Sequence, residues 1–535
     1  MGRPSSTEAA APPRRDPLLW LGALAALGLH ARVLFAAEHL PLVDWPVHVG
    51  LISILAHGGE SGALAYFVRS WAPNPYALFY WTSALLAQVL PVVTAAKLAL
   101  LFGSAGLLAG AASLARALGG EPRLALLAPM GFFGQAYGFG FASFCFTLPL
   151  ALWCWAELEW TLRSASDPTP GAERRWARLA AAAALVYLGH ALVFLAVVWV
   201  TGVRLLVHIV SVRTGRRRAA LAVTLGLSPA FLLGVIRVGL LLRGPSRITE
   251  TTPGDEGPFL DFPAWAERWS TLRWNLLDRG SEAHLAPMYA VVIMFLALAS
   301  IGLLQRARGA LRPATGLRFG RLAVVAGVVG LYALGPDSIL RPFGVWLFYS
   351  RFATLAAIVI FIAVPVRLRG PLGPIAAAAM LGLVAWDAAL QRGHVERHGP
   401  VAAAYDGVRR VVPEGARVLA LGYGLPPDDP VRDHSTLRKL AFYHLADGAA
   451  YVNGLFDNPL IPVQYRDDVE RPRAPFWRTP QRFDPSTHGR DYDVLVLRGA
   501  PVESARASAH HRLVAEVRGW FVFETVPPPA WPSPR

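Results

Sequence analysis

Most of the first 390 residues form long hydrophobic runs separated by short polar segments. A bilayer-spanning helix needs about 20 mostly apolar residues, because the hydrocarbon layer is about 30 Å thick and each residue rises about 1.5 Å. The pattern therefore predicts a mainly α, polytopic transmembrane helical bundle of about 11 spans. We place the spans near residues 17–37, 76–92, 94–115, 123–137, 139–158, 179–203, 219–242, 286–305, 319–335, 345–366 and 371–390.

The pattern changes near Gln391, where long apolar runs end and charge and proline rise. Helical periodicity at 401–412 precedes three short β-type runs, at 417–421, 494–497 and 521–523, which predict buried strands. A C-terminal α/β domain is therefore expected. The predicted organisation is a cytoplasmic tail (1–16), a transmembrane domain (17–390) with external loops near 38–75 and 244–284, and a soluble domain (391–535).

Composition supports this organisation. Hydrophobic residues make up 54% of the chain and charged residues only 16%, whereas about a quarter of a soluble globular chain is charged. Apolar richness also excludes intrinsic disorder. Cys145 and Cys154 are the two cysteines, and nine positions on one helix would hold them too far apart to bridge, so a disulfide-built scaffold is excluded.

The net charge of +15 raises the question of nucleic-acid binding. Most of the excess lies between the hydrophobic runs, in arginine-rich loops at 204–218, 306–321 and 367–369, which is typical of the positive-inside rule. Nucleic acid is therefore not an expected partner. Placing these loops inside puts the N-terminus in the cytoplasm and the C-terminal domain outside, in a multi-pass protein of a bacterial inner membrane. The loop at 159–178 falls outside on this count although it carries four arginines and three acids.

The first external loop carries the most informative motif, Leu42-Val43-Asp44-Trp45-Pro46-Val47-His48-Val49-Gly50. Asp44 and His48 would share one face of a helix that begins here, and the apolar run after them predicts a helix along the membrane surface. Asp44 followed by a proline in the first turn is also typical of an N-cap. Both interpretations of Asp44 stay open.

A single span, a loop with an early aspartate and a surface helix, many further spans and an external α/β domain together resemble the GT-C superfamily of membrane glycosyltransferases. The resemblance implies transfer of a sugar from a polyprenyl-phosphate carrier to a glycan, lipid or protein acceptor on the extracytoplasmic side. It also implies that Asp44 acts as the base or helps to hold a divalent metal, Mg or Mn. Many members have a second acid directly after this position, whereas Trp45 stands here, so His48 is the alternative partner.

Four further residues are candidates for substrate binding: Arg237, Arg351, His190 and Tyr349. Arginines in the outer third of a span are costly in hydrocarbon, and an anionic phosphate held bidentately would offset this cost. Snorkelling or an internal salt bridge is the alternative for each arginine. His190, expected near the middle of a span, is a polar core contact or a site residue, and Tyr349 adjoins Arg351.

Other signals have more ordinary interpretations. Trp265, Trp269 and Trp274 in the second external loop are a membrane belt or a saccharide platform. The glycine-rich segment 131–140 predicts close helix packing. The acid-rich run at 428–434 predicts a solvated loop. Two other function classes remain: a lipid-linked saccharide flippase or transporter, in which the buried arginines line a path, and a non-catalytic membrane scaffold.

Overall fold

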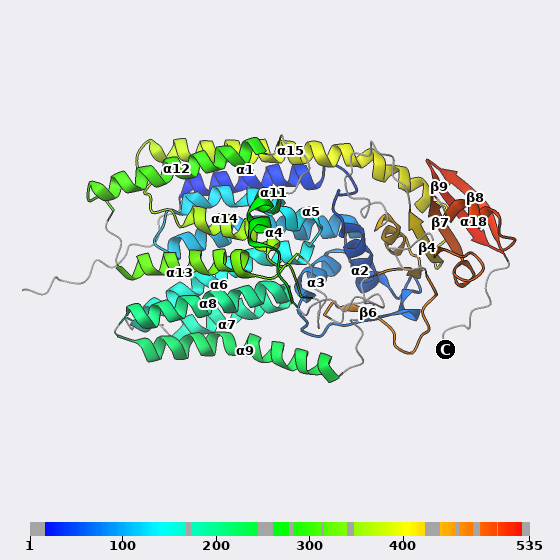
Figure 1. Ribbon diagram of the computed structural model, residues 1–535, viewed down its shortest axis with the longest axis horizontal. Coiled ribbons are helices and arrows are strands. Elements are labelled where there is room, and N and C mark those ends of the chain that lie inside the picture. Colours follow the sequence, from blue (N-terminus) through cyan, green and yellow to red (C-terminus); the bar gives the residue numbers. More distant parts are fainter. Residues whose placement is uncertain are drawn as a thin grey trace, which may run out of the picture.

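The computed structural model describes residues 16–166, 173–212, 214–243, 260–277, 283, 285–311, 315–339, 347–422, 439–455, 460–474, 482–499 and 501–526. Within these ranges a helical bundle forms one end of the molecule and a smaller α/β unit forms the other (Figure 1). The acid-rich run at 428–434 lies outside the described residues.

Six described helices are long and apolar enough to cross a membrane: α1 (Pro17–Leu34), α4 (Val92–Ala117), α8 (Ala191–Ser211), α9 (Arg216–Arg243), α12 (Leu285–Ala307) and α15 (Leu372–Arg409). The bundle also contains α6 (Ala142–Ser166), α7 (Glu173–Gly189), α13 (Thr315–Leu334) and α14 (Ala353–Ile362). Cys145 and Cys154, both on α6, are buried free thiols, as predicted. The polytopic helical bundle predicted from the hydrophobic pattern is confirmed.

Two predicted spans are not spanning α-helices. The run at 76–92 forms α3 (Ala77–Leu86), whose ten residues rise only about 15 Å. The run at 123–137 forms a 3-10 helix, η2 (Pro122–Phe133), followed by the single-turn α5 (Gln135–Gly138). Apolar content alone does not distinguish a spanning helix from a short buried one, which explains the error at 76–92. The run at 123–137 does cross the bundle, because Arg123 contacts Asp16 and Leu368 at one end and the Gly138 carbonyl accepts from the Val43 N–H at the other.

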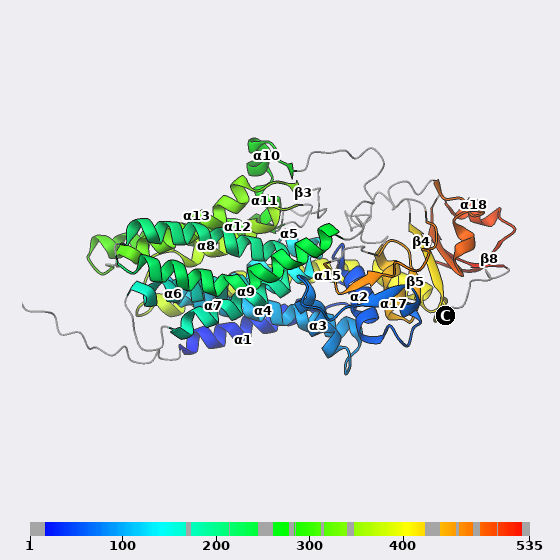
Figure 2. The same ribbon diagram turned by 90° about the horizontal axis from the view of Figure 1, so that it is seen from below.

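A third predicted span, 179–203, is a hairpin of two helices. α7 ends at Gly189, and α8 begins at Ala191 after the extended residue His190. The two helices lie side by side (Figures 1 and 2). His190 is therefore at the turn of a hairpin and not near the middle of a span. The hairpin also places the 159–178 loop at the same end of the bundle as the arginine-rich loop at 204–218, which removes the one disagreement in the predicted topology.

The first external loop folds into a buried unit. It consists of α2 (Trp45–His57), η1 (Ala63–Ala65) and β1 (Phe67–Arg69). Every residue of α2 from Trp45 to Leu55 is buried, and the helix contacts α3, α4 and the C-terminal domain. The prediction of a helix lying on the membrane surface is wrong, because protein encloses this helix.

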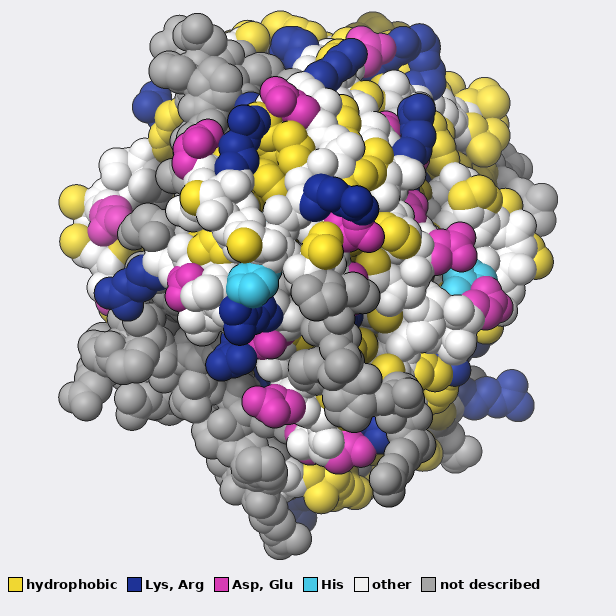
Figure 3. Space-filling view, turned by 90° about the vertical axis from the view of Figure 1, so that its right-hand side faces the viewer, with side chains coloured by type: hydrophobic (Ala, Val, Ile, Leu, Met, Phe, Trp, Pro, Cys, Tyr) yellow, Lys and Arg dark blue, Asp and Glu magenta, His cyan; other side chains and the backbone are white. Residues whose placement is uncertain are grey.

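The C-terminal domain contains a five-stranded sheet of order β5-β4-β7-β9-β8, in which β4 is parallel to β5 and β7, and β9 is antiparallel to β7 and β8. The three predicted strands are confirmed as β4 (Arg417–Gly422), β7 (Val494–Arg498) and β9 (Trp520–Thr525). The remaining elements are η5 (Leu440–Phe442), α17 (Tyr443–Ala446), β5 (Tyr451–Val452), β6 (Val463–Tyr465), η7 (Gly489–Asp491), α18 (Pro501–Arg506) and β8 (His511–Val517). The outer face of this end carries interspersed charges of both signs, as expected for a surface in water (Figure 3).

The C-terminal domain docks directly on the first external loop. β6 pairs antiparallel with β1, and the Ser53 hydroxyl donates to the Leu445 carbonyl at 3.0 Å. Gly50 makes this approach possible, because a Cβ there would lie 2.9 Å from Leu445 Cδ1 and 3.0 Å from the Phe442 carbonyl. α15 runs from the bundle into the domain without a break across position 391.

The described part of the second loop predicted as external, here called the second external unit, projects from the bundle beside α12 and α13 (Figure 2). It contains β2 (Leu260–Asp261), α10 (Trp265–Ser270) and α11 (Leu272–Leu277), and β2 pairs with β3 (Ser338–Ile339). The 3-10 turn η4 (Ser350–Phe352) lies between this unit and α14.

Candidate functional site

Asp44 stands at the N-cap position of α2 but does not cap the helix. Its φ and ψ are −94° and 0°, and its side chain makes no cap hydrogen bond. The carboxylate accepts a hydrogen bond from the Lys439 ammonium instead. The backbone N–H of Asp44 is fixed by the Phe139 carbonyl at 3.1 Å. The side chain of Asp44 is therefore held for a contact outside the helix.

His48, one turn along α2, is held at both ring nitrogens. Nδ1 lies 2.7 Å from the Tyr80 hydroxyl, and Nε2 lies 2.8 Å from the Gly140 carbonyl. A carbonyl only accepts, so Nε2 carries the proton and Nδ1 accepts from Tyr80. Burial lowers the pKa of His48 to about 4, against the smaller opposing effect of Asp44. His48 is a neutral side chain that ties α2 to α3 and to the 135–140 segment.

Gly140 has a steric role in this site. Its φ is +79°, a conformation that L side chains rarely adopt, and a Cβ there would lie 2.7 Å from the Asp44 amide nitrogen. The 131–140 segment does pack closely, as predicted, since a Cβ at Gly134 would lie 2.4 Å from Thr354 Oγ1. The packing prediction missed that the same segment also holds Asp44 and His48.

Arg351 and His190 approach the same place from other helices. The Arg351 guanidinium lies over the Phe141 ring, 3.5 Å from its centroid, and interacts electrostatically with Asp44. His190 lies within electrostatic range of Arg351, and its ring packs edge-on against Phe144. The His190 Nδ1 accepts from the Leu192 N–H at 3.2 Å, so it caps α8 while its ring contacts the site.

Two tyrosines complete this cluster. The Tyr76 ring lies 4.3 Å from the His190 ring, centroid to centroid, and Tyr76 interacts electrostatically with Arg351. Tyr80 interacts electrostatically with Asp44 in addition to its hydrogen bond with His48. Four of the six residues predicted as site residues therefore lie together: Asp44, His48, His190 and Arg351.

The structure does not bring the other two predicted residues to this cluster. Arg237 lies on α9, where its electrostatic partner is Tyr187. The Tyr349 hydroxyl lies 3.4 Å from Thr271 Oγ1, and the Arg268 guanidinium lies 4.6 Å from the Tyr349 ring centroid. Although Tyr349 is two residues from Arg351 in the sequence, it faces the second external unit.

Lys439 is the functional candidate that the sequence analysis missed. It precedes η5 in the C-terminal domain, and the docking of η5 and α17 on α2 carries it to Asp44. One sequence signal could have found it: Lys439 and Lys97 are the lysines of a chain whose other basic side chains are all arginine. A compact ammonium at such a position suggests a specific contact, and Lys97 likewise makes one, donating to the Ala37 carbonyl at 2.5 Å.

We also tested the site against the Mg or Mn ion that the GT-C resemblance implies. A divalent ion needs several oxygen ligands, whereas the Asp44 carboxylate is occupied by an ammonium. Among the described residues, the group with metal-ligand spacing is Glu38, His39 and Asp406. There Arg409 already lies 2.9 Å from Asp406 and 3.6 Å from Glu38, as in an ion-pair cluster. The residues at Asp44 do not fit a metal in this arrangement.

Two crystal structures are similar to this chain over nearly its whole length. One is ArnT from Cupriavidus metallidurans bound to undecaprenyl phosphate, with a TM-score of 0.48 and 13% identity, covering 97% of this chain and 100% of that chain. The other is ArnT from Cupriavidus metallidurans in the apo state, with a TM-score of 0.41 and 14% identity, covering 94% and 97%. No family model and no curated protein sequence matches.

Proposed function

We propose that this protein is a membrane glycosyltransferase of GT-C type that transfers a sugar from a polyprenyl-phosphate-linked donor to an acceptor on the extracytoplasmic side. The convergence of Asp44 and Arg351 carries the proposal. These residues lie 307 positions apart on different elements, and sugar transfer from a lipid phosphate needs a base and a cation at one place.

Asp44 is the general base in this scheme. The acceptor hydroxyl loses its proton to the carboxylate as its oxygen bonds to the anomeric carbon of the donor sugar, while the bond from that carbon to the phosphate oxygen breaks. Lys439 binds Oδ1 of Asp44, so Oδ2 is the oxygen that remains to take the proton. This scheme runs without a metal ion, because the residues around Asp44 do not fit a divalent cation.

Arg351 and Lys439 receive the carrier phosphate. The leaving phosphate gains a negative charge as the bond breaks, and both cations lie within electrostatic reach of Asp44. The Arg351 guanidinium, which lies over the Phe141 ring, can bind an anionic phosphate through two of its N–H groups. His48 and Tyr80 hold α2, and with it Asp44, in place. His48 does not take the proton of the acceptor hydroxyl, because both of its ring nitrogens already have hydrogen-bond partners.

The orientation belongs to the same proposal. The arginine-rich connections α8–α9 and α12–α13 lie at the end of the bundle away from the C-terminal domain (Figure 1). With those connections in the cytoplasm, the C-terminal domain and the Asp44 site face the outer side of a bacterial inner membrane. The acceptor is a glycan, lipid or protein that this side can supply.

The test compares two half-buried arginines, Arg351 and Arg237, in vesicles that contain a polyprenyl-phosphate-linked sugar. Arg351→Gln is expected to lower kcat about a hundredfold, because it removes a group that stabilises the charge developing on the leaving phosphate. Arg237→Gln, whose side chain faces Tyr187, is expected to leave kcat unchanged. Equal effects of the two substitutions would contradict the assignment. Movement of the lipid-linked sugar without a new glycosidic bond would favour a flippase instead.

A further inference from the structure

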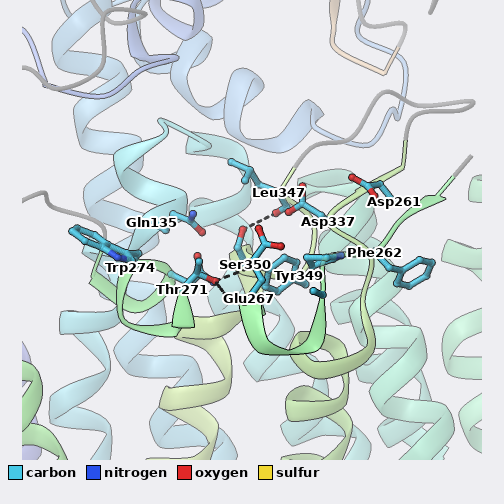
Figure 4. A pocket seen from close by; sticks show the side chains of 13 residues that line it. Gln135, Asp261, Phe262, Glu267, Thr271, Trp274, Asp337, Leu347, Tyr349 and Ser350 are labelled. Atoms are coloured by element: carbon cyan, nitrogen blue, oxygen red, sulfur yellow. Dashed lines mark hydrogen bonds between the residues drawn. The ribbon is translucent and has the colours of Figure 1, made fainter. Parts of the chain in front are cut away.

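A cavity lies between the second external unit and η4, close to the candidate active site. Its volume is about 630 Å³. Figure 4 shows the side chains that line it. Its polar lining consists of Gln135, Asp261, Glu267, Thr271, Asn275, Asp337, Tyr349 and Ser350. Ser350 directly precedes Arg351 and Gln135 begins the segment that ends at Gly140, so the cavity and the Asp44 site share two walls.

Three side-chain hydrogen-bond donors in the cavity lining, on Ser350, Thr271 and Asn275, already have partners. Ser350 Oγ donates to the Leu347 carbonyl at 3.2 Å, and Thr271 Oγ1 donates to the Glu267 carbonyl at 2.8 Å. The amide nitrogen of Asn275 donates to the Tyr332 hydroxyl at 3.1 Å. What the cavity offers to a ligand is therefore mostly hydrogen-bond acceptors.

Gln135 supplies a buried acceptor with no partner. Only 8% of its surface is exposed, and its Oε1 makes no hydrogen bond. The side-chain amide points toward Thr271 and Ser350 (Figure 4). Leaving a buried carbonyl unpaired is costly, and a donor brought by a ligand, with a small rotation of the amide, would remove that cost.

The charge of the cavity is negative. Asp261, Glu267 and Asp337 contribute three carboxylates, and none of them makes an ion pair within 4 Å among the described residues. Burial, together with the nearby charges of Asp261 and Glu267, raises the pKa of Asp337. The charge of Arg268 opposes this rise in pKa, and its guanidinium donates to the Tyr332 carbonyl at 3.0 Å and stacks on Tyr349.

A bare metal ion does not suit this arrangement. The three carboxylates do not form a group whose oxygens lie within 4.8 Å of one another, since the one such group among the described residues lies elsewhere. The cavity volume also exceeds the space of an ion and admits an organic molecule.

We propose that this cavity binds an organic cation, a ligand that carries a protonated primary amine together with hydroxyl groups. The ammonium lies among Asp261, Glu267 and Asp337, and another donor of the ligand reaches Gln135 Oε1. The site does not depend on sugar transfer, and the proposal holds whether or not Asp44 is a catalytic base.

A matched pair of small molecules tests the proposal on the full-length protein in detergent. The probes are tris(hydroxymethyl)aminomethane, in its protonated form at neutral pH, and pentaerythritol, in which a neutral hydroxymethyl group replaces the ammonium. Ligand-observed NMR in phosphate buffer measures both affinities. The amine is expected to bind at least about fivefold more tightly than pentaerythritol. Added salt is expected to weaken the binding of the amine, because part of the attraction is between exposed charges.

Substitutions in the lining test whether the two probes bind in this cavity. The double substitution Glu267→Gln with Asp337→Asn is expected to abolish the preference for the amine, and Gln135→Leu to weaken both probes. Asp44→Asn is expected to leave amine binding unchanged, which separates this test from the test of sugar transfer. Equal affinity for the two probes, or an undiminished amine preference in the folded double variant, would overturn the proposal.

Discussion

The Lys439 ammonium donates a hydrogen bond to the Asp44 carboxylate across 395 positions of the chain. The C-terminal domain is therefore part of the candidate active site and not a separate appendage. The β1–β6 pairing and the contact between Ser53 and Leu445 hold the two parts together at this place. Separating the domain from the bundle would remove a cation from beside Asp44.

Replacing Lys439 should lower sugar transfer without unfolding the protein. Lys439→Gln removes a cation from beside the carrier phosphate, and we expect about a tenfold to hundredfold loss in kcat. Lys439→Arg keeps the charge and is expected to retain more activity than Lys439→Gln. Steady-state transfer rates of both variants, matched for elution in size-exclusion chromatography, check this. Full activity of Lys439→Gln would show that the contact with Asp44 is only structural.

Gly140→Ala should disturb the site more than a comparable glycine substitution elsewhere. Both Gly140, at φ +79°, and Gly370, at φ +56°, have conformations that cost an alanine about 1 to 2 kcal/mol. A Cβ at Gly140 also meets the Asp44 amide at 2.7 Å, whereas nothing lies within 4 Å of one at Gly370. Thermal unfolding and transfer rates check this: Gly370→Ala is expected to keep its activity and Gly140→Ala to lose it. Similar activity in the two variants would contradict the role of Gly140.

His48 should make the protein less stable in mild acid. Its pKa is lowered to about 4, so between pH 6.5 and 4 the unfolded chain binds a proton that the folded chain excludes. The contribution of His48 to the free energy of unfolding is fully present above about pH 6.5 and falls by about 3 kcal/mol toward pH 4. Unfolding midpoints of the wild type and His48→Gln at pH 7.5 and pH 5 measure this. The two proteins are expected to differ less at pH 5, and an unchanged difference would contradict a neutral His48.

A buried ion pair inside the bundle should be sensitive to single substitutions. Arg204 on α8 binds the Glu159 carboxylate of α6 through two nitrogens, one of them at 3.0 Å, and both residues are almost fully buried. Removing one partner leaves an uncompensated charge, so Arg204→Met is expected to destabilise the protein by about 3 to 5 kcal/mol. The double variant Arg204→Met with Glu159→Leu is expected to recover most of the loss. Thermal unfolding of the wild type, Arg204→Met, Glu159→Leu and the double variant checks this. If the losses of the two single variants simply add in the double variant, the prediction is contradicted.

The sequence predicted the helical bundle and the three strands because hydrophobic runs and β-type runs follow from local composition. It could not separate the α7–α8 hairpin at His190 from a single span, because the apolar run is continuous and the turn takes one residue. Asp44, His48, His190 and Arg351 were found as chemically unusual residues in apolar surroundings. Lys439 was not, because its place depends on how a distant domain docks on α2.

The measurement that tests the central claim most directly is sugar transfer by Asp44→Asn in reconstituted vesicles with a labelled polyprenyl-phosphate-linked sugar. The substitution keeps the size of the side chain and removes the base, so the account predicts that product formation is abolished. The same variant is expected to insert in the membrane and to elute as the folded protein does. A folded Asp44→Asn variant that still forms the glycosidic bond at the wild-type rate would contradict the account.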